Sequence, residues 1–74
     1  MEKIWVIFKG GKVEEAYPTK KLAEGAFAYK RWSYDMSGLD SSVFIMKEMP
    51  AKTDMPVNTE APQIPAEWRN NYLK

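Results

Sequence analysis

The sequence predicts an α+β domain in which a three-stranded antiparallel sheet (ββαβ, strand order 2-1-3) packs against one helix. Three observations indicate this class. The short apolar run Ile4–Phe8 leads into the glycine pair at positions 10 and 11, as a strand does when it enters a hairpin. A stretch with the apolar spacing of a helix follows Thr19. A second apolar run begins near Ser42 and is ended by Pro50.

The first strand is expected over Lys3–Lys9. Its middle is apolar at every position, whereas a strand with one solvent-exposed face alternates apolar and polar residues. Both faces of this strand therefore need to be covered. The two glycines suit a two-residue turn, because both central residues of that turn need positive φ. Lys12–Tyr17 should then return antiparallel as a more polar edge strand, with Val13 and Tyr17 facing the core.

The helix is expected to begin after Thr19, which is a plausible N-cap, and to extend to about Tyr34. Helical spacing predicts one broad apolar face that consists of Leu22, Ala23, Ala26, Phe27, Tyr29, Ser33 and Tyr34. Glu24, Arg31 and Asp35 fall on the opposite, solvent side. A third stripe holds Gly25, Ala28 and Trp32. Gly25 weakens a helix relative to alanine, so either another segment approaches closely there or the glycine is merely tolerated.

A loop over Met36–Ser42 leads to the last strand, expected over Ser42–Met49. The simplest topology places the first strand in the centre, with a right-handed crossover to the last one. The helix then covers one face of the sheet. The other face, which carries either Trp5 and Ile7 or Ile4, Val6 and Phe8, has no cover within residues 1–50. Its cover must be the remaining tail, a second copy of the chain in a homodimer, or another protein.

Residues 51–74 differ in composition from the predicted domain of residues 1–50. Prolines alternate with polar residues and no apolar period survives, which predicts an extended tail. A short helix can begin at Pro65, since proline suits the first helical turn. Ile64, Trp68 and Tyr72 would share one side of it, and a helix this short needs a surface to lie on, either the domain or a partner.

The composition removes several kinds of chemistry. Without cysteine or histidine, disulfides are impossible and the usual zinc and copper sites nearly so, and we expect no metal or other cofactor. The serines near Asp35 and Asp40 lie outside any Gly-x-Ser-x-Gly elbow and are interpreted as turn and capping residues. We therefore predict a protein that is not an enzyme. No apolar run has the length of a membrane span or a signal peptide, so we expect a cytoplasmic protein.

The aromatic residues favour protein binding. Tryptophan, tyrosine and arginine dominate interface hot spots. The predicted partner-binding residues are therefore Trp32, Arg31, Trp68, Arg69, Tyr72 and, next, Trp5. The alternative for the tail is intramolecular, with the ridge of Ile64, Trp68 and Tyr72 packing on the open sheet face or on the stripe at Gly25.

Nucleic-acid binding is the second hypothesis. It would use the sheet face and its flanking lysines, with Lys9, Lys12, Lys47 and Phe44 as the contacts, because aromatic residues beside positive charge can stack single-stranded bases. A net charge of +1 and the lack of a basic stripe argue against it.

The hairpin and the helix start also carry a resemblance. Residues 3–13 and 16–24, KIWVIFKGGKV and AYPTKKLAE, resemble the opening of many small uncharacterised proteins, frequently phage-encoded. The likeness covers about residues 3–49 and brings no active site. It implies a host-takeover or counter-defence protein, located in the host cytoplasm, that binds a bacterial host protein and inhibits or redirects it.

Overall fold

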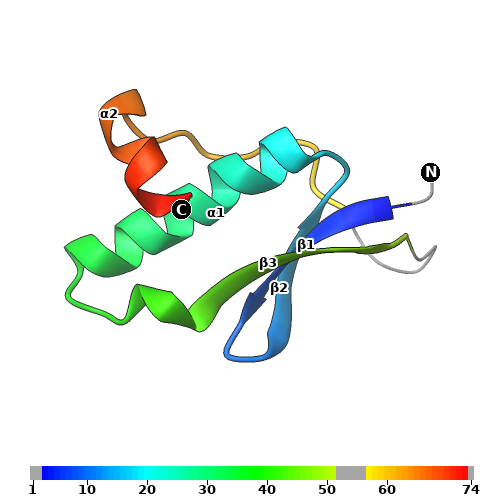
Figure 1. Cartoon of the computed structure of the whole chain (residues 1–74), viewed down its shortest axis with the longest axis horizontal. Coiled ribbons are helices and arrows are strands. Elements are labelled where there is room, and N and C mark those ends of the chain that lie inside the picture. Colours follow the sequence, from blue (N-terminus) through cyan, green and yellow to red (C-terminus); the bar gives the residue numbers. More distant parts are fainter. Residues whose placement is uncertain (1–2, 52–56, 74) are drawn as a thin grey trace.

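The computed structural model describes residues 3–51 and 57–73 and confirms the predicted fold class (Figure 1). A three-stranded antiparallel sheet has the order β2-β1-β3, one long helix packs on it, and a short helix lies near the C-terminus. The elements are β1 (Lys3–Lys9), β2 (Lys12–Tyr17), α1 (Lys20–Met36), η1 (Ser41–Val43), β3 (Phe44–Pro50), α2 (Ala66–Arg69) and η2 (Asn70–Tyr72).

The hairpin between β1 and β2 turns at the glycine pair as predicted. Gly10 and Gly11 both have positive φ, at 58° and 86°, which is the requirement that favours glycine in this turn. The pairing register then shifts by one residue, because Ile7 pairs with Glu15 while Phe8 pairs with Val13. The unpaired residue between them is a β-bulge in β2.

This bulge changes which residues of β2 face α1. Tyr17 pairs with Trp5 and is buried on the α1 side, whereas Val13 lies on the opposite face and is 52% exposed. The expectation that Val13 faces the core is therefore wrong. Simple alternation would have kept both side chains on one face, and the extra residue breaks that alternation.

Helix α1 begins as predicted. The side-chain oxygen of Thr19 accepts a hydrogen bond from the backbone N–H of Leu22, at 3.2 Å, which is the contact of an N-cap. The last strand differs in its start, because Ser41–Val43 form a short 3-10 helix and the strand begins at Phe44. Asp40 explains this turn, since its carboxylate accepts hydrogen bonds from the N–H and the hydroxyl of Ser42, at 3.0 and 2.6 Å.

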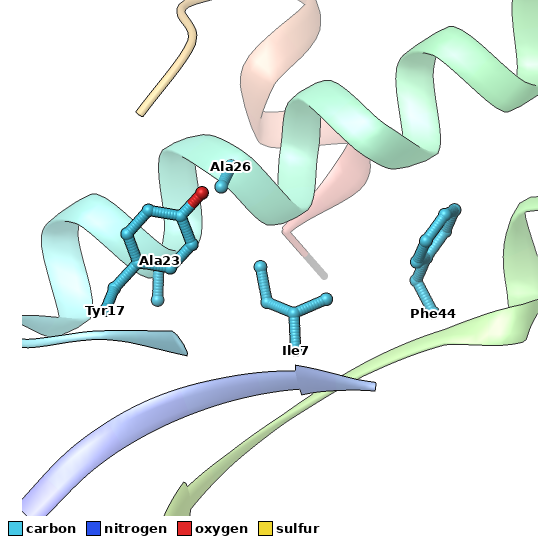
Figure 2. Close-up of a cluster of buried hydrophobic side chains, with 5 residues drawn as sticks. All are labelled: Ile7, Tyr17, Ala23, Ala26 and Phe44. Atoms are coloured by element: carbon cyan, nitrogen blue, oxygen red, sulfur yellow. The ribbon is translucent and has the colours of Figure 1, made fainter. Parts of the chain in front are cut away.

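The main core lies between the sheet and α1. Figure 2 shows its buried side chains in that layer: Ile7, Tyr17, Ala23, Ala26 and Phe44. The alanines let the helix backbone come close to the sheet, and larger aromatic side chains fill the ends of the layer. Partly buried residues complete the cluster, among them Trp5, Leu22, Phe27, Tyr34 and Met46.

The face of the sheet turned away from α1, called the far face below, has a second cluster. Ile4, Val6 and Ala16 are buried there, and the beginning of the tail covers them through Ala51 and Val57, together with Met49 and Phe8. The amide of Asn58 donates a hydrogen bond to the carbonyl of Ala16, at 2.9 Å, which attaches the tail to the outer edge of β2. The tail therefore covers this part of the far face.

The tail then crosses to the side of α1 away from the sheet (Figure 1). A Cβ atom built on Gly25 would lie 3.6 Å from the carbonyl oxygen of Pro62 and 3.8 Å from the Cβ of Ala61. Farther along, α2 and η2 pack on α1. Gly25 thus marks the place where the tail approaches the helix closely, one of the two possibilities that the sequence left open.

Candidate functional site

The described residues offer no enclosed site for chemistry. No pocket lies among the residues that the structure describes. Within residues 3–51 and 57–73 there is no group of three or more side chains able to hold a metal ion. Asp40 lies in the predicted serine-rich loop, and the hydrogen bonds from the Ser42 hydroxyl and N–H hold the pKa of its carboxyl below the usual value. Its geometry is that of a capping residue.

Arg31 and Tyr72 hold the tail against α1 in the free protein. The guanidinium carbon of Arg31 lies 5.6 Å from the ring centre of Phe27 and 5.9 Å from that of Tyr72. Its Nη1 donates a hydrogen bond to the carbonyl of Tyr72, at 3.2 Å. The hydroxyl of Tyr72 donates to the carboxylate of Asp35, at 2.7 Å, and this bond raises the pKa of Tyr72. We call these contacts the tail clamp.

The clamp changes how two predicted contact residues are understood. Arg31 was expected on the solvent side of the helix, but the tail covers that side, and its Nε is buried without a partner among the described residues. Tyr72 is buried. Both side chains have an intramolecular role, and their contact with a partner stays a prediction.

Two of the tryptophan candidates, Trp32 and Trp68, lie on the helices α1 and α2. Trp32 is half-buried and packs on Tyr29, with ring centres 6.0 Å apart and the planes tilted by 44°. Met36 follows on the same stripe of α1, at helical spacing, and is 56% exposed. Trp68 on α2 is 38% exposed, beside the half-buried Arg69. We call Tyr29, Trp32, Met36 and Trp68 the helical surface.

Trp5 lies elsewhere. It is on the α1 side of the sheet, packed against the main core, and the ammonium group of Lys20 lies 5.6 Å from its ring centre. Trp5 is therefore separated from the far face by the sheet itself.

The far face carries an apolar row that the tail leaves open. Phe8 pairs with Val13 on one side and with Ile45 on the other, so the three residues lie side by side across all three strands. Val13 is 52% and Ile45 44% exposed, and Phe8 is half-buried. Lys47 comes next on the same face, with its ammonium 5.9 Å from the ring centre of Phe8. We call Val13, Phe8 and Ile45 the hairpin row.

The residues of the nucleic-acid hypothesis are divided between the two faces. Lys9 and Lys12 lie directly opposite each other at the hairpin end of the α1 side, whereas Lys47 lies on the far face. Lys9 also approaches the ring of Tyr34, at 5.6 Å, and the hydrogen bond with that tyrosine raises the pKa of Lys9. Phe44 is only 4% exposed and packs edge-on against Tyr34, with ring centres 4.7 Å apart. Its ring is not open to a stacking base in this structure.

An ionic group that sequence inspection missed joins β2 to α1. Lys30 lies 3.5 Å from a carboxylate oxygen of Glu14 and 3.4 Å from one of Glu15. The hydroxyl of Tyr17 donates to Glu15, at 2.6 Å. Burial, and then this hydrogen bond, raise the pKa of Tyr17. The adjacent glutamates were the available signal, but the bulge that lets both reach one lysine has no sequence signature.

Comparison of the chain with protein-family models, with curated proteins and with solved structures gave no match. Among the described residues, no helix is long and apolar enough to cross a membrane. The helical surface and the hairpin row are therefore the two candidate interaction surfaces of the described residues.

Proposed function

We propose that this protein is a non-enzymatic protein-binding module that acts by occupying the surface of a partner protein. The observation that carries the proposal is the helical surface. Trp68 is 38% exposed although tryptophan is usually well buried, and it lies on α2, which packs on the helix that carries Trp32. Exposed tryptophan, methionine and tyrosine side chains are typical of surfaces that become buried in a complex.

The nature of the partner follows from the resemblance of the hairpin and helix start. A phage-type accessory protein would bind one bacterial host protein in the host cytoplasm and inhibit or redirect it. This part of the proposal rests on analogy with the opening of such proteins, and it names a class of partner and no individual target.

The test is affinity purification of the tagged protein from a bacterial lysate, with the double variant Trp32→Ser/Trp68→Ser beside the wild type. The variant Leu39→Ser is the matched control, because Leu39 is also exposed but lies outside the helical surface. We expect the wild type and the control to retain the same host protein and the double variant to lose it, with all three chains folded by circular dichroism.

Three results would contradict the proposal. If the double variant unfolds, the tryptophans belong to the core. If it retains the partner as well as the control does, the helical surface is not the site. If the wild type retains nothing, the function itself is wrong. Sizing of the free protein reports whether the surface is instead covered in a homodimer.

Nucleic-acid binding stays as the alternative, because Lys9 and Lys12 face each other at the hairpin end and an anion between them would relieve their repulsion. It predicts affinity for a single-stranded oligonucleotide that falls steeply with added salt. Absence of binding at low salt would contradict this alternative.

A further inference from the structure

The two outer edges of the sheet differ. The edge of β2 receives the tail through the bond from Asn58 to Ala16. On the other side, the amide of Gly10 donates to the carbonyl of Val43, at 3.0 Å, and hydrogen-bonded pairs alternate along antiparallel strands. The amides of Met46 and Glu48 therefore point away from β1.

These outward amides form a short open edge. In the described part of the chain, neither Met46 nor Glu48 has a backbone hydrogen bond outside the sheet's own ladder. The amide of Phe44 is already bonded to the carbonyl of Ser41, and Pro50, the next outward position, has no amide hydrogen. An added strand could pair with β3 over this central part only.

The hairpin row continues this edge on the far face. Ile45 belongs to β3 itself and is the outermost member of the row, with Phe8 and Val13 behind it. A strand added to β3 would place alternate side chains on the far face, next to Ile45 and Lys47. The edge of β3 can thus supply backbone hydrogen bonds, and the hairpin row can supply an apolar contact. These are the two components of recognition by strand addition.

The charges around the edge favour a negative partner. Lys47 lies beside the row on the far face, with its ammonium 5.9 Å from the ring centre of Phe8. The carboxylate of the edge residue Glu48 lies on the opposite, α1 side, 3.9 Å from the ammonium of Lys3. The glutamates of β2 are already bound by Lys30. Lys47 has no carboxylate within 4.0 Å among the described residues.

We infer that the open edge of β3 and the hairpin row bind an extended acidic segment of another protein by strand addition. This site is separate from the helical surface and goes beyond the proposed function, because it gives the protein a second docking surface with a partner of different chemistry.

A second copy of the chain fits this surface less well. The exposed parts of the three side chains amount to on the order of 100–200 Å², taking about 60–120 Å² for one whole apolar side chain. A stable dimer buries about 800 Å² on each partner. Symmetric antiparallel pairing of β3 would also oppose Lys47 to Lys47, or Glu48 to Glu48, in two of its central registers.

The test uses two fluorescein-labelled synthetic peptides of about ten residues, the upper length of ordinary strands. One repeats the residues Val-Thr-Glu-Thr, which places valine and glutamate in turn on one face of the strand, and the other repeats Val-Thr-Lys-Thr. Fluorescence anisotropy gives the affinity for the full chain, and NMR of the ¹⁵N-labelled chain locates the site. We expect only the acidic peptide to bind, with weaker binding at higher salt, and to shift the amide signals of Met46 and Glu48.

Two variants and two matched controls complete the test. Ile45→Thr keeps a β-branched residue but removes apolar contact, and Lys47→Glu reverses the charge; each should raise Kd at least about fivefold. Leu39→Thr also removes apolar contact and Lys21→Glu also reverses a charge, both at exposed positions off this surface, and both should leave Kd unchanged. Melting curves identify any variant that does not fold, and the inference then depends on the other variant.

Other outcomes would overturn the inference. Equal binding of the basic peptide would show that the partner need not be acidic. Unchanged amide signals of Met46 and Glu48 would show that the peptide does not pair with the edge of β3. Stronger competition by a single-stranded oligonucleotide would assign the surface to nucleic acid. A concentration-dependent dimer that Ile45→Thr abolishes would assign it to a second copy. None of these results depends on whether the helical surface retains a host protein.

Discussion

Replacing Gly25 with alanine and with leucine tests whether the tail lies against α1 as described. Alanine is more favourable than glycine in a helix interior by about 0.8–1.0 kcal/mol. Its added Cβ would lie 3.6 Å from the carbonyl oxygen of Pro62 and 3.8 Å from the Cβ of Ala61, both ordinary contact distances. The alanine variant should therefore gain most of that free energy, which raises the melting temperature by about 4–8 °C in a domain of this size.

Leucine separates helix propensity from the presence of the tail. Its propensity is close to that of alanine, so without the tail both variants would gain about the same free energy. With the tail in place, the further carbon atoms meet the backbone at Pro62, and overpacking of this kind costs about 1–3 kcal/mol. We expect the leucine variant of Gly25 to unfold at least about 1 kcal/mol more easily than the alanine variant.

Urea unfolding followed by circular dichroism gives the free energy of unfolding for each variant. Lys21 supplies the control, because it is exposed on the same helix and its alanine and leucine variants should differ by no more than about 0.5 kcal/mol. Equal stabilisation by alanine and leucine at Gly25 would refute the docking of the tail. Destabilisation by alanine would refute the contact distances.

Three further predictions concern the sheet and its link to α1. Ile7→Ala should lower the free energy of unfolding by about 2–5 kcal/mol because Ile7 is fully buried, whereas Val13→Ala should change it by no more than about 0.5 kcal/mol. Equal losses for the two variants in urea unfolding would contradict the bulge. Because the pKa of Tyr17 is raised above 10.0 in the folded chain, its stabilising contribution is complete below that pH and is lost as the pH rises further. Melting temperatures measured above about pH 10 should then fall less steeply for Tyr17→Phe, and a steeper fall would contradict the assignment. Lys30→Met should lower the melting temperature, since it leaves two carboxylates of β2 close together, and Lys30→Arg should lower it less. An unchanged melting temperature for Lys30→Met would show that the ionic group contributes nothing to stability.

The sheet order and the helix could be predicted because their signals are local. The glycine pair fixes the hairpin, Thr19 fixes the helix start, and an apolar run without alternation places β1 in the centre. The bulge in β2 could not be predicted, since a shift of one residue has no local signature, and it alone moves Val13 to the far face.

The tail is the part that sequence reasoning resolved least. Its prolines remove periodicity, so its path depends on contacts with residues distant in the chain, such as Ala16 and Gly25. This has consequences for the candidate site. Arg31 was assigned to solvent from helical spacing alone, and the tail covers it. The hairpin row was not recognised either, because it is the part of the far face that the tail leaves uncovered, and the path of the tail could not be predicted.

Amide hydrogen exchange of the full chain, followed by NMR, tests most directly the claim that the tail closes part of the far face and leaves the edge of β3 open. We expect slow exchange at Asn58, whose amide is bonded to the carbonyl of Ala16, and fast exchange at Met46 and Glu48, whose amides point outward. The backbone amides of Ile45 and Lys47 alternate with these and point toward β1, so they should exchange slowly. Fast exchange at Asn58, or protection of Met46 and Glu48 in the free protein, would contradict it.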